Sequence, residues 1–195
     1  MAQPIGYGGA MVRCLMAVVA AAFCVPGAAT AFFDPITEAC QPPVMTGVAK
    51  AIDGNTLTLA TAGGGTIVIR LHAIDAPDMI QTCRVGEDIW DCGREAKATL
   101  AGLVDGRELA CLACGVDERG RTLATCLDGE TDIGVAMVRS GMALGRAFFS
   151  NALNASQARA KIDGIGMWRG DFVDPDAWRR GERLGEEPCR GCTSP

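Results

Sequence analysis

The segment from Ile67 to Asp78 constrains the fold most strongly, because it combines a strand pattern with a fixed end. Buried-type residues alternate through it, so one face can be apolar while Arg70 points to the other face. Pro77 ends the pattern, with Asp75 and Asp78 close on either side. An arginine on a strand and acids on the following turn can together hold a phosphodiester and a hard cation.

The first 31 residues have the form of an export signal. Arg13 supplies positive charge, an apolar run extends from Cys14 to Val25, and Ala29-Thr30-Ala31 has the small-x-small form of a cleavage site. The run is shorter than the roughly 20 residues of a membrane span. We therefore expect cleavage, and an exported protein, periplasmic or secreted, without stable membrane association.

The rest of the chain is long enough for one domain with a core of its own. The net charge of the whole chain is −5 with its single histidine neutral. Nucleic-acid binding is usually driven by clustered lysine and arginine, so this balance argues against a broad basic surface. Contact with nucleic acid would have to be local and metal-assisted. We expect a monomer, and the sequence identifies no protein partner.

Eight cysteines follow the signal, an even number that favours disulfides in an exported chain. They are Cys40, Cys83, Cys92, Cys111, Cys114, Cys126, Cys189 and Cys192. Short separations favour pairing Cys83 with Cys92, which closes the loop after Pro77. They also favour pairing Cys111 with Cys126, which ties two neighbouring strands.

The last two cysteines leave several interpretations open. Cys189 and Cys192 have the spacing of a bridge or of a redox pair. Together with Cys111 and Cys114 they could also form a four-cysteine zinc site.

Strand patterns come first and helical spacing later. The turn-forming residues Asp53-Gly54-Asn55 predict a hairpin between the first two strands. The expected strands cover 48–52, 57–61, the segment of Arg70, 107–115 and 121–127, and the expected helices cover 93–103, 131–140 and 152–163. Five short strands with an inserted helix predict an α+β fold: a five-stranded barrel of the oligonucleotide-binding (OB-fold) type with about three helices.

These patterns divide the chain into four parts. Residues 1–31 are the signal peptide and 32–46 an N-terminal extension. Residues 47–180 form the barrel domain, and 181–195 a cysteine-containing tail.

The acids near Arg70 suggest phosphodiester chemistry. Cutting a phosphodiester requires positive charge on the non-bridging oxygens, a positioned water and help for the leaving oxygen. Asp53, Asn55, Asp75 and Asp78 lie close to Arg70 in the sequence. Oxygen ligands on short loops favour Ca²⁺ over zinc or copper.

Four motifs in the right order resemble the staphylococcal nuclease-like (thermonuclease) domains. The resemblance covers roughly Val48 to Arg179. The motifs are Asp53-Gly54-Asn55-Thr56, the stretch from Arg70 to Asp78, Asp117-Glu118-Arg119-Gly120-Arg121, and Gly166-Met167-Trp168 followed by Trp178-Arg179.

The resemblance implies a Ca²⁺-dependent phosphodiesterase acting on DNA and RNA, built on a five-stranded OB-fold barrel. Arg70 looks like the arginine that stabilises the pentacovalent phosphate, and Arg121 like its partner nearer the leaving group. Asp75 resembles a direct calcium ligand, and the Ala76 carbonyl takes the place of another. Asp53 matches an outer acid close to the metal.

Three positions depart from the family pattern. Asn55 replaces the second metal-binding aspartate; its amide oxygen can ligate Ca²⁺ but brings no charge, which predicts weaker metal binding. Asp78 replaces the glutamate expected as general base or water-orienting group, and moves the carboxylate by about 1 Å, a misplacement that can cost on the order of 100-fold in rate. Arg119 stands where a tyrosine is common, so base-stacking surface is scarce.

Two functions therefore remain open. One is a weakened thermonuclease-like phosphodiesterase; the other is a catalytically impaired binding module for nucleic acid or a protein. Arg70 and Arg121 could also be structural, forming ion pairs with Asp75 and Asp78.

Overall fold

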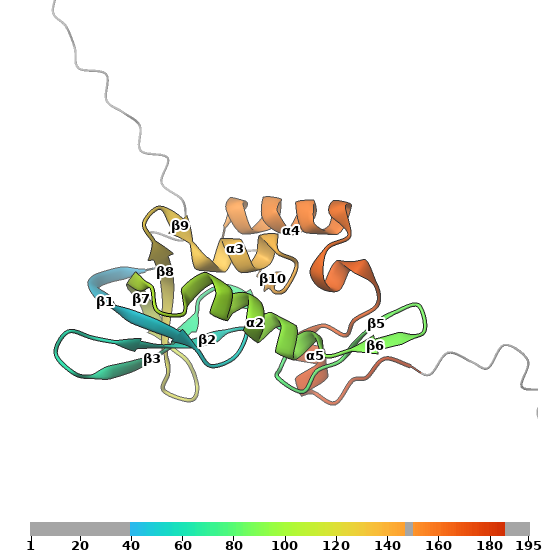
Figure 1. Cartoon of the computed structure of the whole chain (residues 1–195), viewed down its shortest axis with the longest axis horizontal. Coiled ribbons are helices and arrows are strands. Elements are labelled where there is room, and N and C mark those ends of the chain that lie inside the picture. The colour runs from blue at the N-terminus through green and yellow to red at the C-terminus, as the bar shows by residue number, and fades with distance from the viewer. Residues whose placement is uncertain (1–39, 147–149, 186–195) are drawn as a thin grey trace, which may run out of the picture. The chain divides into compact units, whose positions relative to one another are not determined.

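The computed structural model describes residues 40–146 and 150–185 (Figure 1). The expected signal peptide, most of the N-terminal extension, and Cys189 and Cys192 lie outside these ranges. The strands are β1 (Gln41–Ala51), β2 (Thr56–Ala60), β3 (Thr66–Leu71), β4 (Ile74–Asp75), β5 (Cys83–Val85), β6 (Asp88–Trp90), β7 (Glu108–Val116), β8 (Thr122–Asp128), β9 (Thr131–Asp132) and β10 (Leu144–Gly145). The helices are α2 (Cys92–Val104), α3 (Ile133–Arg139), α4 (Asn151–Asp163), the 3₁₀ turn η1 (Gly166–Arg169) and α5 (Pro175–Arg179).

Five strands form a closed mixed barrel. Their order is β3-β2-β1-β7-β8, and a parallel pairing of β3 with β8 closes the ring. In that closing pair Arg70 lies opposite Leu123, two residues beyond Arg121. The predicted α+β barrel of OB-fold type is confirmed. Its closure places Arg70 on β3 beside the start of β8, which Arg121 directly precedes.

The alternation of β3 works as predicted. Ile69 and Leu71 are almost completely buried inside the barrel, whereas Arg70 between them is only half-buried. Helix α2 covers the core with Leu100 and Val104, which recur one turn apart on its buried face. Strand β3 is thus anchored on its apolar face, and the position of Arg70 follows from the pleat of that strand.

Helices α3 and α4 lie side by side (Figure 1). Asp132 caps α3 by accepting a hydrogen bond from the backbone N–H of Val135. The short helix α5 is a fourth α-helix among the described residues, beyond the three expected. None of the helices in the described ranges is long and apolar enough to cross a membrane.

The described residues form three disulfides. Cys83–Cys92 and Cys111–Cys126 confirm the expected pairs, the first closing the β5–β6 hairpin and the second tying β7 to β8. Cys40–Cys114 was not predicted. It joins the start of β1 to β7, so the first strand begins inside the expected extension.

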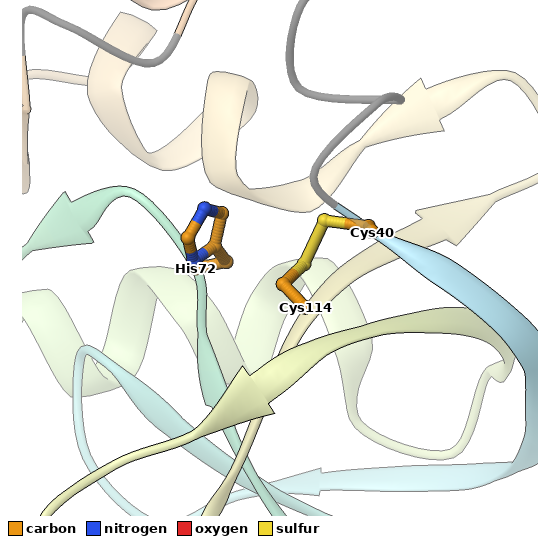
Figure 2. Close-up of side chains that lie close together, drawn as sticks. All are labelled: Cys40, His72 and Cys114. Carbon is orange, nitrogen blue, oxygen red and sulfur yellow. A yellow bond between two sulfur atoms is a disulfide. The ribbon is translucent and has the colours of Figure 1, made fainter.

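Two of the disulfides exclude one of the interpretations of the cysteines. A zinc site containing Cys111 and Cys114 is wrong, because both sulfurs are used in disulfides. Figure 2 shows the ring of His72 close to the Cys40–Cys114 bridge. Burial lowers the pKa of His72, which favours the neutral form of its ring.

Candidate active site

A solvent-open cavity of about 460 Å³ lies beside the closing pair of strands β3 and β8. It brings together five of the residues predicted from the sequence, namely Asp53, Asn55, Arg70, Asp78 and Arg121. Arg119 and Arg179 also line it. Among the described residues that line this cavity none is aromatic, in keeping with the expected scarcity of base-stacking surface.

Asp75 lies next to this cavity and is only 1% exposed. A Coulombic partner is needed to keep a buried carboxylate charged, and Asp75 has three. Arg70 contacts Oδ1 at 3.3 Å, while Arg146 and Arg179 both contact Oδ2. The buried carboxylate is therefore surrounded by guanidinium groups on both of its oxygens.

A sharp reversal after β3 positions Asp75. Ala73 has a φ of 60°, in the left-handed region that costs a non-glycine residue about 1 kcal/mol. The reversal lets β4 pair with β10, where Asp75 lies opposite Leu144. The backbone N–H of Arg146 donates to the Ala73 carbonyl at 2.9 Å, so the same pairing brings Arg146 to Asp75.

The Asp53-Gly54-Asn55 hairpin packs directly on the residues after Asp75. A Cβ on Gly54 would lie 2.8 Å from the Cβ of Ala76, so only glycine allows this approach. Asn55 Oδ1 accepts a hydrogen bond from the Ala76 N–H at 2.7 Å. Its Nδ2 donates to the Ala76 carbonyl at 3.1 Å and reaches Asp75 Oδ1 at 3.5 Å. Asn55 therefore bridges both backbone groups of Ala76.

Asp78 lies in a turn that the buried side chain of Gln81 holds. Gln81 Oε1 accepts a hydrogen bond from the Asp78 N–H at 3.3 Å, and its Nε2 donates to the Val173 carbonyl at 2.7 Å. This links the turn to the segment that leads into α5, which carries Arg179. Arg179 contacts Asp78 Oδ1 at 3.4 Å as well as Asp75. Burial opposes the charge of Arg179, yet its bonds to both carboxylates raise its pKa above the ordinary value.

Arg121 is held by the loop that precedes it. Asp117 Oδ1 accepts the N–H groups of Arg119 and Arg121, both at 2.9 Å. Its Oδ2 accepts from Arg121 Nε at 2.7 Å, and Arg121 Nη1 reaches the Thr56 hydroxyl at 3.3 Å. Although desolvation acts against the shift, these bonds lower the pKa of Asp117. Arg121 is thus fixed in orientation at the cavity wall.

The ion-pair alternative from the sequence is met only in part. Arg70 does pair with Asp75, but Arg121 pairs with Asp117, and Asp78 pairs with Arg179. These pairs leave the arginine side chains 22% to 30% exposed. Their remaining N–H groups can therefore still bind an anion in the cavity.

The oxygens expected to bind Ca²⁺ already accept hydrogen bonds. Both oxygens of Asp75 face guanidinium groups, the Ala76 carbonyl accepts from Asn55, and Asn55 Oδ1 accepts from Ala76. Asp53 Oδ1 accepts from the Asn55 N–H at 2.7 Å. Ca²⁺ takes six to eight oxygen ligands, so binding it here would require these oxygens to exchange their present hydrogen-bond partners for the ion. Calcium binding at these four residues stays a prediction, which a titration tests below.

Three residues of the site escaped sequence reasoning. Arg179 stood in the quoted Trp178-Arg179 motif, which was a usable signal. No sequence signal marked Arg146 or Gln81. The role of Arg146 depends on the β4–β10 pairing, and that of Gln81 depends on a contact with Val173, 92 residues away.

Comparison with known proteins agrees with this arrangement. A family model described as "Staphylococcal nuclease homologue" matches residues 68–170. An "Uncharacterized endonuclease" of Haemophilus influenzae is 34% identical over 140 residues, covering 70% of this chain and 74% of the relative. "Protein ParB" of Escherichia coli is 28% identical over 147 residues, covering 68% of this chain and 77% of the relative.

Proposed function

We propose that this chain, which belongs to the family of staphylococcal nuclease homologues, hydrolyses the phosphodiester bonds of nucleic acid in the cavity lined by Arg70 and Arg121. One observation carries the proposal. The parallel pairing of β3 with β8 sets two charged, hydrogen-bonded arginines beside one cavity that also contains a carboxylate, Asp78. Two guanidinium groups can stabilise the charge on a phosphate, and a carboxylate can orient the attacking water.

Each residue has a definite part in the proposed reaction. Arg70 and Arg121 bind the non-bridging oxygens and stabilise the charge that grows on them as the phosphorus becomes five-coordinate. Asp78 orients the attacking water and takes its proton while the new P–O bond forms. Arg121 donates a hydrogen bond to the leaving oxygen as the old P–O bond breaks, and solvent protonates that oxygen afterwards.

Cleavage of single-stranded DNA by the purified, oxidised protein tests the proposal. Arg70→Ala should lower the cleavage rate by about 100-fold or more, the cost of losing a transition-state donor. Arg107→Ala is the matched control, because the exposed Arg107 pairs with Asp128 and does not line the cavity. Equal rates for the unchanged protein and Arg70→Ala would refute the proposed function.

A catalytically impaired binding module is the second candidate, and one contact favours it. One carboxylate oxygen of Asp78 is paired with Arg179, and the side chain is one methylene shorter than the expected glutamate. Oligonucleotide binding without turnover would support this candidate. Turnover that Arg70→Ala abolishes would remove it.

We also propose that the protein is exported. Three disulfides among the described residues support an oxidising compartment. Fractionation of cells that produce the full chain tests this proposal, and oxidised protein confined to the cytosolic fraction would refute it.

A further inference from the structure

We propose that this site works without a divalent cation: Asn55 closes the position a cation would take beside Asp75, and the guanidinium of Arg179 supplies the positive charge at the phosphate instead. The inference rests on the proposed phosphodiesterase function and concerns the same cavity. The orientation of the Asn55 amide and the partners of the Asp75 carboxylate support it.

The orientation of the Asn55 amide is fixed by its neighbours. The Ala76 N–H can only donate, so the side-chain atom 2.7 Å from it must be the oxygen. The amide nitrogen then has to face the other way. There it meets the Ala76 carbonyl at 3.1 Å and Asp75 Oδ1 at 3.5 Å. A flipped amide would set its nitrogen against an N–H group and its oxygen against two other oxygens.

An aspartate at this position would create the opposite situation. Its second oxygen would stand where Asn55 Nδ2 now is, next to a carbonyl and a carboxylate oxygen that also lack a proton. Three oxygens converging in a buried place need a cation or a proton between them. The N–H₂ group of Asn55 satisfies the other two oxygens directly, so nothing in this place requires a metal.

The charge of Asp75 is also compensated without a metal. Arg70, Arg146 and Arg179 contact its two oxygens, and all three belong to the chain itself. A divalent cation would have to displace these groups and then face their repulsion. Both features therefore disfavour a divalent cation. Asn55 closes the ligand position, and the guanidinium groups neutralise the Asp75 carboxylate.

Arg179 is the group able to take over the cation's role toward the substrate. It lines the cavity, whereas Arg146 does not. Its side chain is 30% exposed, and its bonds to Asp75 and Asp78 hold the guanidinium in place. A guanidinium has five N–H donors, so donors remain for a phosphate oxygen. Arg146 serves as a positioning residue for Asp75, and its Nη1 also lies 3.7 Å from Asp174 Oδ2.

Two independent measurements test the inference. Cleavage is compared in excess chelator and in millimolar Ca²⁺, and calorimetry measures Ca²⁺ binding directly. We expect rates within about twofold of each other, and no heat of Ca²⁺ binding in the calorimeter. Cleavage that appears only with Ca²⁺, or stoichiometric Ca²⁺ binding in the cavity, would overturn the inference and leave the proposed function standing. Absence of cleavage in both media would sink the proposed function, and calorimetry alone would then decide about the cation.

Substitution of Asn55 sharpens the test. Asn55→Asp should create a calcium site, with Ca²⁺ affinity at least about tenfold above the unchanged protein and a melting temperature that rises only when Ca²⁺ is added. Asn154→Asp, the same chemical change on the exposed face of α4, should gain neither. Should Asn55→Asp fold only in the presence of Ca²⁺, that result supports the inference equally. An Asn55→Asp protein that folds and still ignores Ca²⁺ would contradict it.

Substitution of Arg179 tests the second half of the inference. Arg179→Gln should lower cleavage about tenfold or more, and added Ca²⁺ should not restore it. Restoration by Ca²⁺ would show that the cation still has a place in the site.

Discussion

The substitution Asp75→Asn probes the centre of the site, because it removes one charge and changes almost no volume. In the native protein the carboxylate is 1% exposed and contacts three guanidinium groups, from Arg70, Arg146 and Arg179. After the change an amide nitrogen replaces one of the two oxygens, so at least one guanidinium faces another N–H donor. The three positive charges then repel one another without a counter-charge between them.

The size of the effect follows from burial. Removing one partner of a buried ion pair costs about 3–5 kcal/mol. Here the arginine side chains are 22% to 37% exposed, so water can reach them and the lower end, about 3 kcal/mol, applies. In a domain of this size each kcal/mol corresponds to about 2–4 °C, which predicts a fall in melting temperature of about 6–12 °C.

Thermal and urea unfolding followed by circular dichroism measure this loss. Asp128→Asn is the matched control. Within the described ranges Asp128 pairs with a single arginine, the exposed Arg107, so this change should cost under about 1 kcal/mol. Inorganic phosphate should restore part of the lost stability in Asp75→Asn more than it stabilises the unchanged protein, because the freed guanidinium groups bind it. Equal stability of Asp75→Asn and the control would refute our account of the carboxylate.

Three further outcomes are expected. Replacing Cys111 and Cys126 together by alanine opens a loop of 15 residues and should cost about 3 kcal/mol in urea unfolding; an unchanged midpoint would contradict the structural role of that bridge. Gln81→Ala leaves the Asp78 N–H and the Val173 carbonyl without their partner, so it should cost about 2 kcal/mol of folding stability. It should also reduce cleavage, because the turn that carries Asp78 becomes looser. Normal cleavage would show that the turn needs no such support. The pKa of Asp117 is lowered in the folded protein, so its carboxylate stays charged and keeps its bonds to Arg121 at neutral and mildly acidic pH. These bonds are lost only as the pH falls through the lowered pKa. A carboxyl-carbon NMR titration that gives an ordinary or raised pKa for Asp117 would exclude this.

Local patterns in the sequence predicted the parts of the site that depend on one strand or one turn. The alternation of β3 determined how Arg70 points, and the Asp-Gly-Asn turn located Asp53 and Asn55. Both features need only neighbours in the chain, which a periodic pattern records. Five short strands with an inserted helix also predicted a barrel of OB-fold type, whereas the β3–β8 pairing that closes it is seen only in the structure.

The parts that escaped prediction depend on contacts between distant segments. Strands β4 and β10 have two residues each, too few for any periodicity, yet their pairing brings Arg146 to Asp75. Cys40 and Cys114 are separated by 74 residues, and only the extended first strand brings them together. The orientation of Asn55 likewise depends on the Ala76 N–H, whose position depends on the packing of the hairpin against the following turn.

The arrangement around Asp75 implies a compromise between stability and substrate binding. A metal-held site gains its counter-charge only when the ion is present, whereas Arg70, Arg146 and Arg179 neutralise Asp75 in every solution. Arg70 and Arg179, the two of these groups that line the cavity, must also bind phosphate, and an N–H group donated to Asp75 is not available to the substrate. Affinity for the phosphodiester is therefore limited by how strongly Asp75 holds Arg179. A longer or more exposed carboxylate at position 75 would bind Arg179 less strongly. Affinity for the phosphodiester would then rise while folding stability falls. Across substitutions at this position, substrate affinity and folding stability should therefore change in opposite directions.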